Sequence, residues 1–417
     1  MDDSPIFNAN VVIENNRIVY IGNDISKYEP FDLIRDCHNN LLMPGFKNCH
    51  THSAMTFMRS KADEQSLHDW LFNEVFPREQ NLREDDIYWL SKLAFLEYIA
   101  NGETLVCDQY FFPLDCARAA KEMGMRMLIQ ITFSPTSHTM DDNIESLYHE
   151  FNDPKESLVR FALGMHAEYT GGDEDFRILK ELVHKLKAPF YTHISESENE
   201  VKECIQRRNM TPVQFFDSLG MFDYGGGCYH CVHFTDEDIE IFKKRNLSVI
   251  SCPGSNSKLA SGVAPLYKYQ KAGLNIALGT DGAASNNSLD MFKEMTLASF
   301  LQKLMIKDPV AIDAYDILKM ATINGSKALG MEDTSTLEVG KLADIIEINL
   351  SSPCMQPFTD IVRNIVYAGN PSIVSMTMIN GKILYDNGHF DVGENIQTIY
   401  DKCQEISDRL DAQIKTA

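Results

Sequence analysis

The stretch GFKNCHTH (45–52) opens a series of short apolar runs that alternate with amphipathic helical patterns. Seven further runs of the same kind are TLVCDQY (104–110), RMLIQITF (126–133), RFALGMHAE (160–168), PFYTHIS (189–195), GCYHCVHF (227–234), LSVISCP (247–253) and LNIALGTDG (274–282). Helical patterns at 84–101, 173–187 and 236–245 separate several of them. Alternation of strand and helix is typical of a parallel sheet with crossover helices. Eight such units predict an α/β fold with a closed (β/α)8 TIM barrel over residues 44–336, and an open doubly wound sheet is the alternative.

Both ends of the chain carry strand patterns of a different kind. NVVIENNRIVYIG (10–22) has β-branched residues on both sides of a polar turn, which predicts a hairpin. LEVGKLADIIEINL (337–350) and VSMTMINGKILYD (374–386) predict hairpins as well, the latter with Asn380-Gly381 at its turn. Each piece needs a partner sheet. We therefore expect residues 1–43 and 337–417 to form one composite β-sandwich domain.

The amino-acid composition excludes some classes of binding partner. The 417 residues include 38 Lys+Arg and 60 Asp+Glu, a net charge of −22, which argues against nucleic acid and anionic membranes. No run reaches about 18 apolar residues, so no membrane span is expected. MDDSPIFNAN (1–10) lacks the basic and apolar regions of a signal peptide, and the ten cysteines are expected to be reduced thiols of a cytoplasmic protein.

Histidines and an aspartate cluster where the predicted strands end, and these ends share one face of a parallel barrel. His50 and His52 stand at i and i+2, a spacing that puts both imidazoles on one face of a strand. With a third nitrogen from His193 and an oxygen from Asp281, they predict a site for a divalent metal ion, with a position left open for water. Glu196 follows His193 by three residues and is suited to move a proton of that water.

Other strand-end residues give weaker signals. On a strand, His230 and His233 would point to opposite faces, so only one should face the barrel mouth. Cys228 and Cys231 have the C-x-x-C spacing of a metal or redox pair, but their apolar surroundings favour buried thiols. His166-Ala167-Glu168 resembles half of a cytidine-deaminase signature, but Gly227 stands where that signature has proline.

Several stretches together resemble the amidohydrolase superfamily. They are MPGFKNCHTH (43–52), THISESE (192–198), HCVH (230–233), CPGSNSKLASG (252–262), LGTDGAASNN (278–287) and LEVGKLADIIEI (337–348). They occur in the family's order and span nearly the whole chain. The branch they resemble holds the 5-methylthioadenosine/S-adenosylhomocysteine deaminases and their chlorohydrolase-like relatives.

The resemblance implies a barrel with a β-sandwich built from both termini, and one divalent metal ion, zinc or alternatively iron. His50, His52, His193 and Asp281 would hold this ion. The fourth predicted strand does not end in a lysine that could bridge two ions, which favours a mononuclear site.

The resemblance also implies catalytic roles. Hydroxide on the metal would attack the amino-bearing ring carbon while Glu196 protonates the ring nitrogen. His230 and Asp281 would stabilise the attacking oxygen, and ammonia would leave.

For the substrate, the resemblance implies contacts from Trp70, Glu79 and His166, with Glu79 accepting hydrogen bonds from ribose hydroxyls. GMRMLIQITFSPTSHTMDDN (124–143) lacks the arginines that relatives use for a homocysteine carboxylate; Arg126 stands early in the strand and His138 is the only other cation candidate. The favoured function is therefore hydrolytic deamination of methylthioadenosine or adenosine, with S-adenosylhomocysteine as a third candidate.

Two alternatives remain at this point. One is an aminohydrolase or chlorohydrolase of another N-heterocycle, such as guanine, a pterin, cytosine or an s-triazine. The other, from a different class, is an inactive barrel that acts as a binding protein. The expected partner is a small heterocyclic substrate, and a homo-oligomer is compatible with the resemblance.

Overall fold

The computed structural model describes residues 6–61, 63–64, 70–133, 144–153 and 157–416. Its centre is a sheet of eight parallel strands in the order β11-β10-β9-β8-β7-β6-β5-β4. The strands are β4 (Phe46–Thr51), β5 (Glu103–Gln109), β6 (Met127–Phe133), β7 (Val159–Met165), β8 (Phe190–Ile194), β9 (Gly226–His230), β10 (Ser248–Ser251) and β11 (Asn275–Leu278). All eight predicted strands are present, which confirms the barrel prediction.

The first and last strands approach each other and nearly close the barrel. The backbone N–H of Thr280 donates to Asn48 Oδ1 (3.0 Å), and that of Asp281 donates to the carbonyl of His50 (2.9 Å). Gly279 makes this approach possible, because a Cβ there would lie 2.7 Å from the backbone nitrogen of His50. The closure brings the first and last strands of the barrel together.

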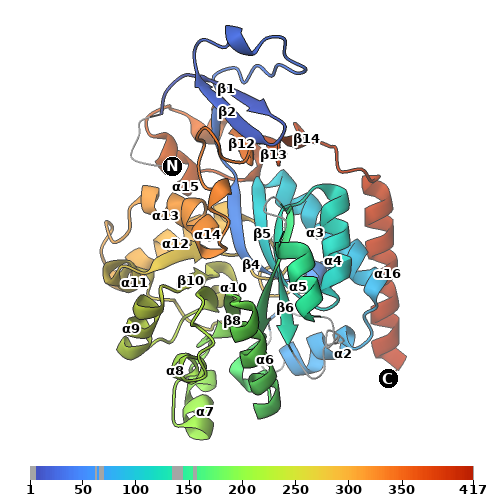
Figure 1. Cartoon of the computed structure of the whole chain (residues 1–417), viewed down its shortest axis with the longest axis vertical. Coiled ribbons are helices and arrows are strands. Elements are labelled where there is room, and N and C mark those ends of the chain that lie inside the picture. Colours follow the sequence, from blue (N-terminus) through green and yellow to red (C-terminus); the bar gives the residue numbers. More distant parts are fainter. Residues whose placement is uncertain (1–5, 62, 65–69, 134–143, 154–156, 417) are drawn as a thin grey trace.

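Helices surround the barrel (Figure 1). Those following β4 to β8 are α2 (Phe76–Glu79), α3 (Glu84–Ala100), α4 (Pro113–Met123), α5 (Ile144–Asn152), α6 (Asp173–Leu186), α7 (Glu198–Arg208) and α8 (Pro212–Ser218). Those following β9 to β11 are α9 (Asp236–Arg245), α10 (Pro253–Lys258), α11 (Leu266–Ala272), α12 (Met291–Ile306), α13 (Ala314–Met320) and α14 (Ile323–Ala328). The predicted helices at 84–101, 173–187 and 236–245 correspond to α3, α6 and α9.

Helix α9 shows how local sequence sets these elements. Thr235 caps its first turn, since Thr235 Oγ accepts from the Asp238 N–H (3.2 Å) and Asp238 Oδ2 accepts from the Thr235 N–H (2.8 Å). Acidic residues occupy the first turn and basic residues the last, as the helix dipole favours. Asn246 then ends the helix in the left-handed region (φ 52°).

The barrel interior below the strand ends is packed with apolar side chains. These are Cys49, Leu105, Cys107, Leu128, Ala162, Tyr191, Tyr229, Ile250 and Ala277, with Ala328, Leu329 and Met331 completing the cluster. The interior below the strand ends is therefore a packed core rather than an open channel. All ten cysteines are free thiols, as predicted.

Two antiparallel sheets lie at one end of the barrel, and helices α6, α7 and α8 lie toward the other end (Figure 1). One is the hairpin β1 (Asn10–Glu14) and β2 (Arg17–Gly22); the other has the order β15-β14-β13-β12-β3. The second sheet joins β3 (Leu41–Pro44) to β12 (Ile345–Ile348), β13 (Val374–Ile379), β14 (Lys382–Asp386) and β15 (His389–Phe390). Ile18, Ala343, Ile345 and Met376 pack between the sheets, so both termini build the expected sandwich.

Two details extend or correct the sequence prediction. The hairpin expected at 337–350 is wrong: only β12 forms there, and it pairs with β3 and β13. Residues before β12 bind β2 instead, because Gly340 N–H donates to the Ile18 carbonyl (2.8 Å).

Helices α15 (Ile361–Tyr367) and α16 (Ile396–Thr416) complete the chain, and α16 packs along α3. The proposed domain boundaries at residues 43/44 and 336/337 stay a prediction.

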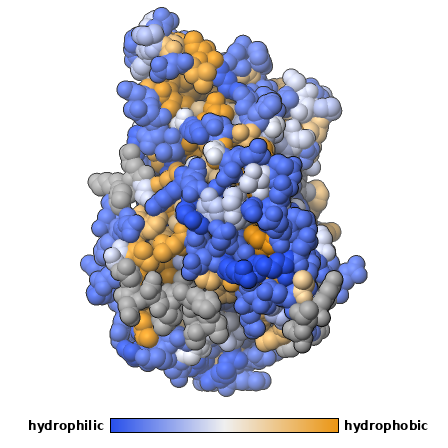
Figure 2. Space-filling view, turned by 90° about the vertical axis from the view of Figure 1, so that its right-hand side faces the viewer, coloured by the Kyte–Doolittle hydropathy of each residue, from blue (hydrophilic) through white to orange (hydrophobic). Residues whose placement is uncertain are grey.

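The surface agrees with the composition. Hydrophilic residues predominate on the face drawn in Figure 2. Across the described parts of the chain, no helix combines the length and apolar character needed to cross a bilayer.

Candidate active site and metal centre

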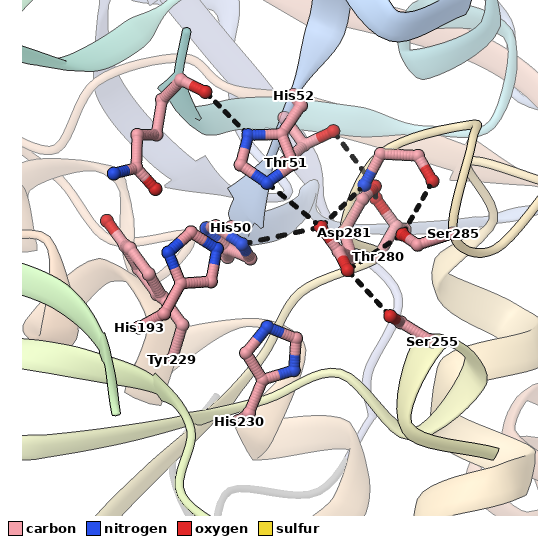
Figure 3. A network of polar contacts seen from close by, with 12 residues as sticks. His50, Thr51, His52, His193, Tyr229, His230, Ser255, Thr280, Asp281 and Ser285 are labelled. Atoms are coloured by element: carbon pink, nitrogen blue, oxygen red, sulfur yellow. Dashed lines mark hydrogen bonds and ion pairs between the residues drawn. The ribbon is translucent and has the colours of Figure 1, made fainter. Parts of the chain in front are cut away.

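The strand ends bring four histidines and one aspartate together (Figure 3). His50 lies on β4, His193 on β8 and His230 at the end of β9, while His52 and Asp281 directly follow β4 and β11. Ligand atoms of His50, His52 and His193 lie within 4.8 Å of one another, as do those of His50, His230 and Asp281. Residues more than 200 positions apart in sequence thus share one centre.

His50 is the most enclosed member of this cluster. It is fully buried, and neither ring nitrogen has a hydrogen-bond partner in the described chain; Nε2 lies 3.4 Å from Asp281 Oδ1. Burial lowers the pKa of His50 to about 3, so its ring is neutral. Tyr229 stacks beneath it at 3.7 Å between centroids. A neutral, buried imidazole without a partner fits a metal ligand, since an orphaned polar group otherwise costs about 1–3 kcal/mol.

His52 and His193 are oriented by backbone carbonyls. Nδ1 of His52 donates to the carbonyl of Gln109 (2.5 Å), and Nδ1 of His193 donates to the carbonyl of His166 (2.8 Å). Each bond fixes the tautomer in which Nε2 carries the lone pair. This arrangement, with the distal nitrogen held by the protein, is typical of metal-binding histidines.

Asp281 supplies an oxygen that points to the same centre. Its Oδ2 accepts from the hydroxyls of Ser255 (2.6 Å) and Ser285 (2.7 Å), while Oδ1 lies 3.2 Å from Nε2 of His52. Burial opposes ionisation, but the neighbouring His50 and His52 outweigh it and lower the pKa of Asp281 well below its usual value. The carboxylate in turn raises the pKa of His52 to about 9, against the effect of burial.

Glu196 and His230 border this cluster. Oε2 of Glu196 lies 3.9 Å from Nε2 of His230, and Oε1 accepts from the Ser261 hydroxyl (3.3 Å). Nδ1 of His230 donates to Asn256 Oδ1 (2.8 Å), so Nε2 is the nitrogen free to accept a proton.

His233 is directed elsewhere. Strand β9 ends at His230, where His230 and Cys231 adopt positive φ (68° and 51°), so strand alternation does not govern the residues beyond. Nε2 of His233 lies 2.8 Å from the Ser261 carbonyl.

The three expected substrate residues lie at different distances from the cluster. The His166 ring is 4.6 Å from the His193 ring, and burial lowers the pKa of His166 to about 4. Glu79 ends α2 and accepts from the Tyr110 hydroxyl (2.7 Å); the Tyr110 ring lies 6.2 Å from that of His52. Trp70 begins the short π-helix η3 (Trp70–Val75) and is buried in the main apolar core.

Of the two cations considered for a homocysteine carboxylate, Arg126 does not lie at this site. Arg126 precedes β6, at the end of the barrel that faces the terminal sheets, and binds Asp344 there (2.6 Å). His138 lies outside the described residues.

Sequence reasoning missed the side chains that orient the predicted residues. Ser255 and Asn256 lie in CPGSNSKLASG and Ser285 in LGTDGAASNN, stretches noticed only for their resemblance. Gln109 offered no signal, because its contact with His52 uses the backbone carbonyl.

Comparison with known proteins places this geometry in a family. The sequence matches the amidohydrolase family over residues 41–384. It is 37% identical over 391 residues to a 5-methylthioadenosine/S-adenosylhomocysteine deaminase of Caldanaerobacter subterraneus subsp. tengcongensis, covering 92% of this chain and 90% of the relative. It is also 37% identical over 399 residues to a 5'-deoxyadenosine deaminase of Methanothermobacter thermautotrophicus, covering 94% and 93%.

A solved structure extends the similarity to three dimensions. An adenosine deaminase from Xanthomonas campestris with bound zinc superposes with a TM-score of 0.90 at 30% identity, covering 98% of this chain and 94% of that one. The family match covers more than half of the sequence and includes every residue of the histidine–aspartate cluster. This chain therefore belongs to the amidohydrolase family.

Proposed function

We propose that this protein is a divalent-metal-dependent hydrolytic deaminase of adenine nucleosides. The observation that carries the proposal is the pair Glu196 and His230, 3.9 Å apart, beside the neutral, buried imidazole of His50 and the ionised carboxylate of Asp281. The names of the relatives support the same reaction, since they are a 5-methylthioadenosine/S-adenosylhomocysteine deaminase, a 5'-deoxyadenosine deaminase and an adenosine deaminase.

His50, His52, His193 and Asp281 would hold one metal ion. Zinc is the proposed metal because imidazole and carboxylate suit it and because the Xanthomonas campestris relative binds it. A bound ion supplies a Lewis acid that lowers the pKa of water from 15.7 towards about 7.

The chain's own residues then move the protons. Nε2 of His230 and Oδ1 of Asp281 accept hydrogen bonds from the water that adds to C6 of the purine. Glu196 takes a proton from this water and delivers it to the ring nitrogen N1, which makes C6 more electrophilic. Glu196, His230 and Asp281 then carry the second proton of the added water to the amino group. Collapse of the tetrahedral carbon breaks the C6–N bond, and the amino group leaves as ammonia.

Recognition of the nucleoside falls to residues around the cluster. We assign Glu79 to the ribose hydroxyls, His166 to the base and Trp70 to the wall of the pocket. A half-buried carboxylate suits a diol, since both hydroxyls can donate to it. Adenosine and methylthioadenosine are favoured over S-adenosylhomocysteine, because residues 127–143 contain no arginine or lysine to pair with a carboxylate.

The test is ammonia release by zinc-loaded protein, with chloride release measured in addition for the triazine. The panel contains adenosine, 5'-deoxyadenosine, methylthioadenosine, S-adenosylhomocysteine, guanine, cytosine and an amino-substituted chloro-s-triazine. We expect turnover of adenine nucleosides and a loss of about 10²–10⁴-fold in kcat for Glu196→Gln. Glu198→Gln is the matched control, because Glu198 is exposed and pairs with Lys202 (2.8 Å).

Two results would contradict the proposal. Turnover of guanine, cytosine or the triazine with no nucleoside activity would assign the site to another heterocycle. Silence on the whole panel by protein that retains its metal would favour a binding protein.

A further inference from the structure

We propose that Glu200 is a positioning residue for the reaction: its buried carboxylate holds the turn that presents Glu196 to the substrate. The inference rests on the proposed function, because it takes Glu196 as the proton carrier. It adds a residue that neither the spacing of the sequence nor the family resemblance singled out.

The carboxylate of Glu200 spans two consecutive peptide groups. Oε1 accepts from the backbone N–H of Ser195 (2.7 Å), and Oε2 accepts from the backbone N–H of Glu196 (2.8 Å). Glu200 is 7% exposed and Ser195 is fully buried, so water cannot readily replace these bonds. Each oxygen has its own donor, which fixes the position and the tilt of the peptide that carries Glu196.

The turn that Glu200 holds is strained. Ser195 adopts φ 51°, a left-handed conformation that costs an L-residue roughly 1–2 kcal/mol. The carbonyl of Ser195 is also bound, by the N–H groups of Val232 (3.1 Å) and His233 (2.9 Å). The peptide is therefore clamped on both sides: by Glu200 through its N–H, and by the segment following His230 through its carbonyl.

Helix capping alone does not account for this arrangement. Ser197 caps α7, since its hydroxyl accepts from the Glu200 N–H (3.2 Å). In a capping box the glutamate at the third helical position binds the N–H of the capping residue itself. Glu200 instead reaches the two residues that precede Ser197. Burial and the nearby charge of Glu196 raise the pKa of Glu200 to about 7, so the carboxylate is held at this place against an electrostatic cost.

The experiment compares Glu200→Gln and Glu200→Ala with the wild type in zinc-loaded protein. We expect kcat for adenine nucleosides to fall about 10–100-fold, with KM and metal content unchanged. Glutamine keeps one acceptor oxygen, so Glu200→Gln should lose less than Glu200→Ala. The control Glu198→Gln removes a charge from the same helical turn without touching the clamp and should leave kcat unchanged.

A second measurement distinguishes an effect on the position of Glu196 from a general loss of structure in the barrel. In a Glu196→Gln background, Glu200→Gln should change the residual rate less than about twofold, because residues that act as a unit are not additive. An equal loss in both backgrounds, a loss of zinc, or a wild-type kcat in both Glu200 variants would overturn the inference. Wild-type turnover in the same assay reports on the proposed function independently.

Discussion

His230 takes its orientation from a single side chain. Its Nδ1 donates to Asn256 Oδ1 at 2.8 Å, which leaves Nε2 as the basic nitrogen facing Glu196. Both residues are at least 98% buried, so no solvent molecule readily takes the place of the amide. The tautomer of His230 is thus set by a residue in α10.

Replacing Asn256 by alanine should therefore lower kcat about 10–100-fold, because the His230 ring loses the acceptor that selects its tautomer. Steady-state kinetics on adenosine would measure this. Ser257→Ala is the control on the same short helix, since Ser257 is exposed and binds only the Pro253 carbonyl in the described contacts. An unchanged kcat for Asn256→Ala would show that His230 is held by other means.

The histidine–aspartate cluster could be predicted from the sequence, but the side chains that orient its members could not. His50 and His52 follow each other at strand spacing, and His193 and Asp281 stand at predicted strand ends, so the topology of a parallel barrel is enough to gather them. Ser255, Asn256 and Glu200 contact Asp281, His230 and Ser195 through loop conformations. Those conformations depend on tertiary packing, which residue spacing does not encode.

At the level of elements, turns decide where the terminal strands pair. The predicted turn Asn380-Gly381 joins β13 to β14, with both residues at positive φ (54° and 80°). A Cβ on Gly381 would lie 2.1 Å from the Asn15 carbonyl oxygen, so this turn also packs against the β1–β2 hairpin. Gly388, in the next turn, has φ 90° but open space around it.

Alanine substitutions at these two glycines distinguish the cost of a strained backbone from the cost of a steric clash. Gly388→Ala should destabilise the protein by roughly 1–2 kcal/mol through its backbone conformation alone. Gly381→Ala should cost about 1–3 kcal/mol more, because the hairpin must also move away. Urea unfolding of both variants measures the difference, and equal losses would mean that the contact with Asn15 carries no energy.

The wrong hairpin at 337–350 has a physical cause. The strand pattern at 345–348 is real, but the two hydrogen-bonding edges of β12 are paired with β3 and β13 rather than with the preceding residues. Local alternation reports which side of a strand is buried and says nothing of which strand covers its edge.

At the scale of the molecule, one buried ion pair joins the barrel to the terminal sheets. Arg126 donates to both oxygens of Asp344 (2.6 and 3.1 Å) and to Asn380 Oδ1 (3.0 Å). Arg126 and Asp344 are 2% and 1% exposed. Removing either residue would leave the other buried charge without its ion-pair partner.

Arg126→Met should accordingly lower the free energy of unfolding by about 3–5 kcal/mol, and adding Asp344→Leu should restore much of it. Thermal and urea unfolding would measure both variants. Arg177→Met is the control: this exposed arginine pairs with Glu174 and Glu181 on the surface of α6, and its loss should not be measurable. A small effect of Arg126→Met would mean that Asp344 finds solvent at the junction.

The pairing of β3 with β12 has a consequence for the order of assembly. β3 leads directly into β4, the strand that carries His50, yet its hydrogen-bonding partner emerges from the ribosome only after all eight barrel strands. Contacts this distant in sequence form late, because the loop they close is long. The hydrogen-bonding edge of β3 therefore stays unpaired until β12 has been synthesised. A chain truncated before β12 would expose that edge to neighbouring chains.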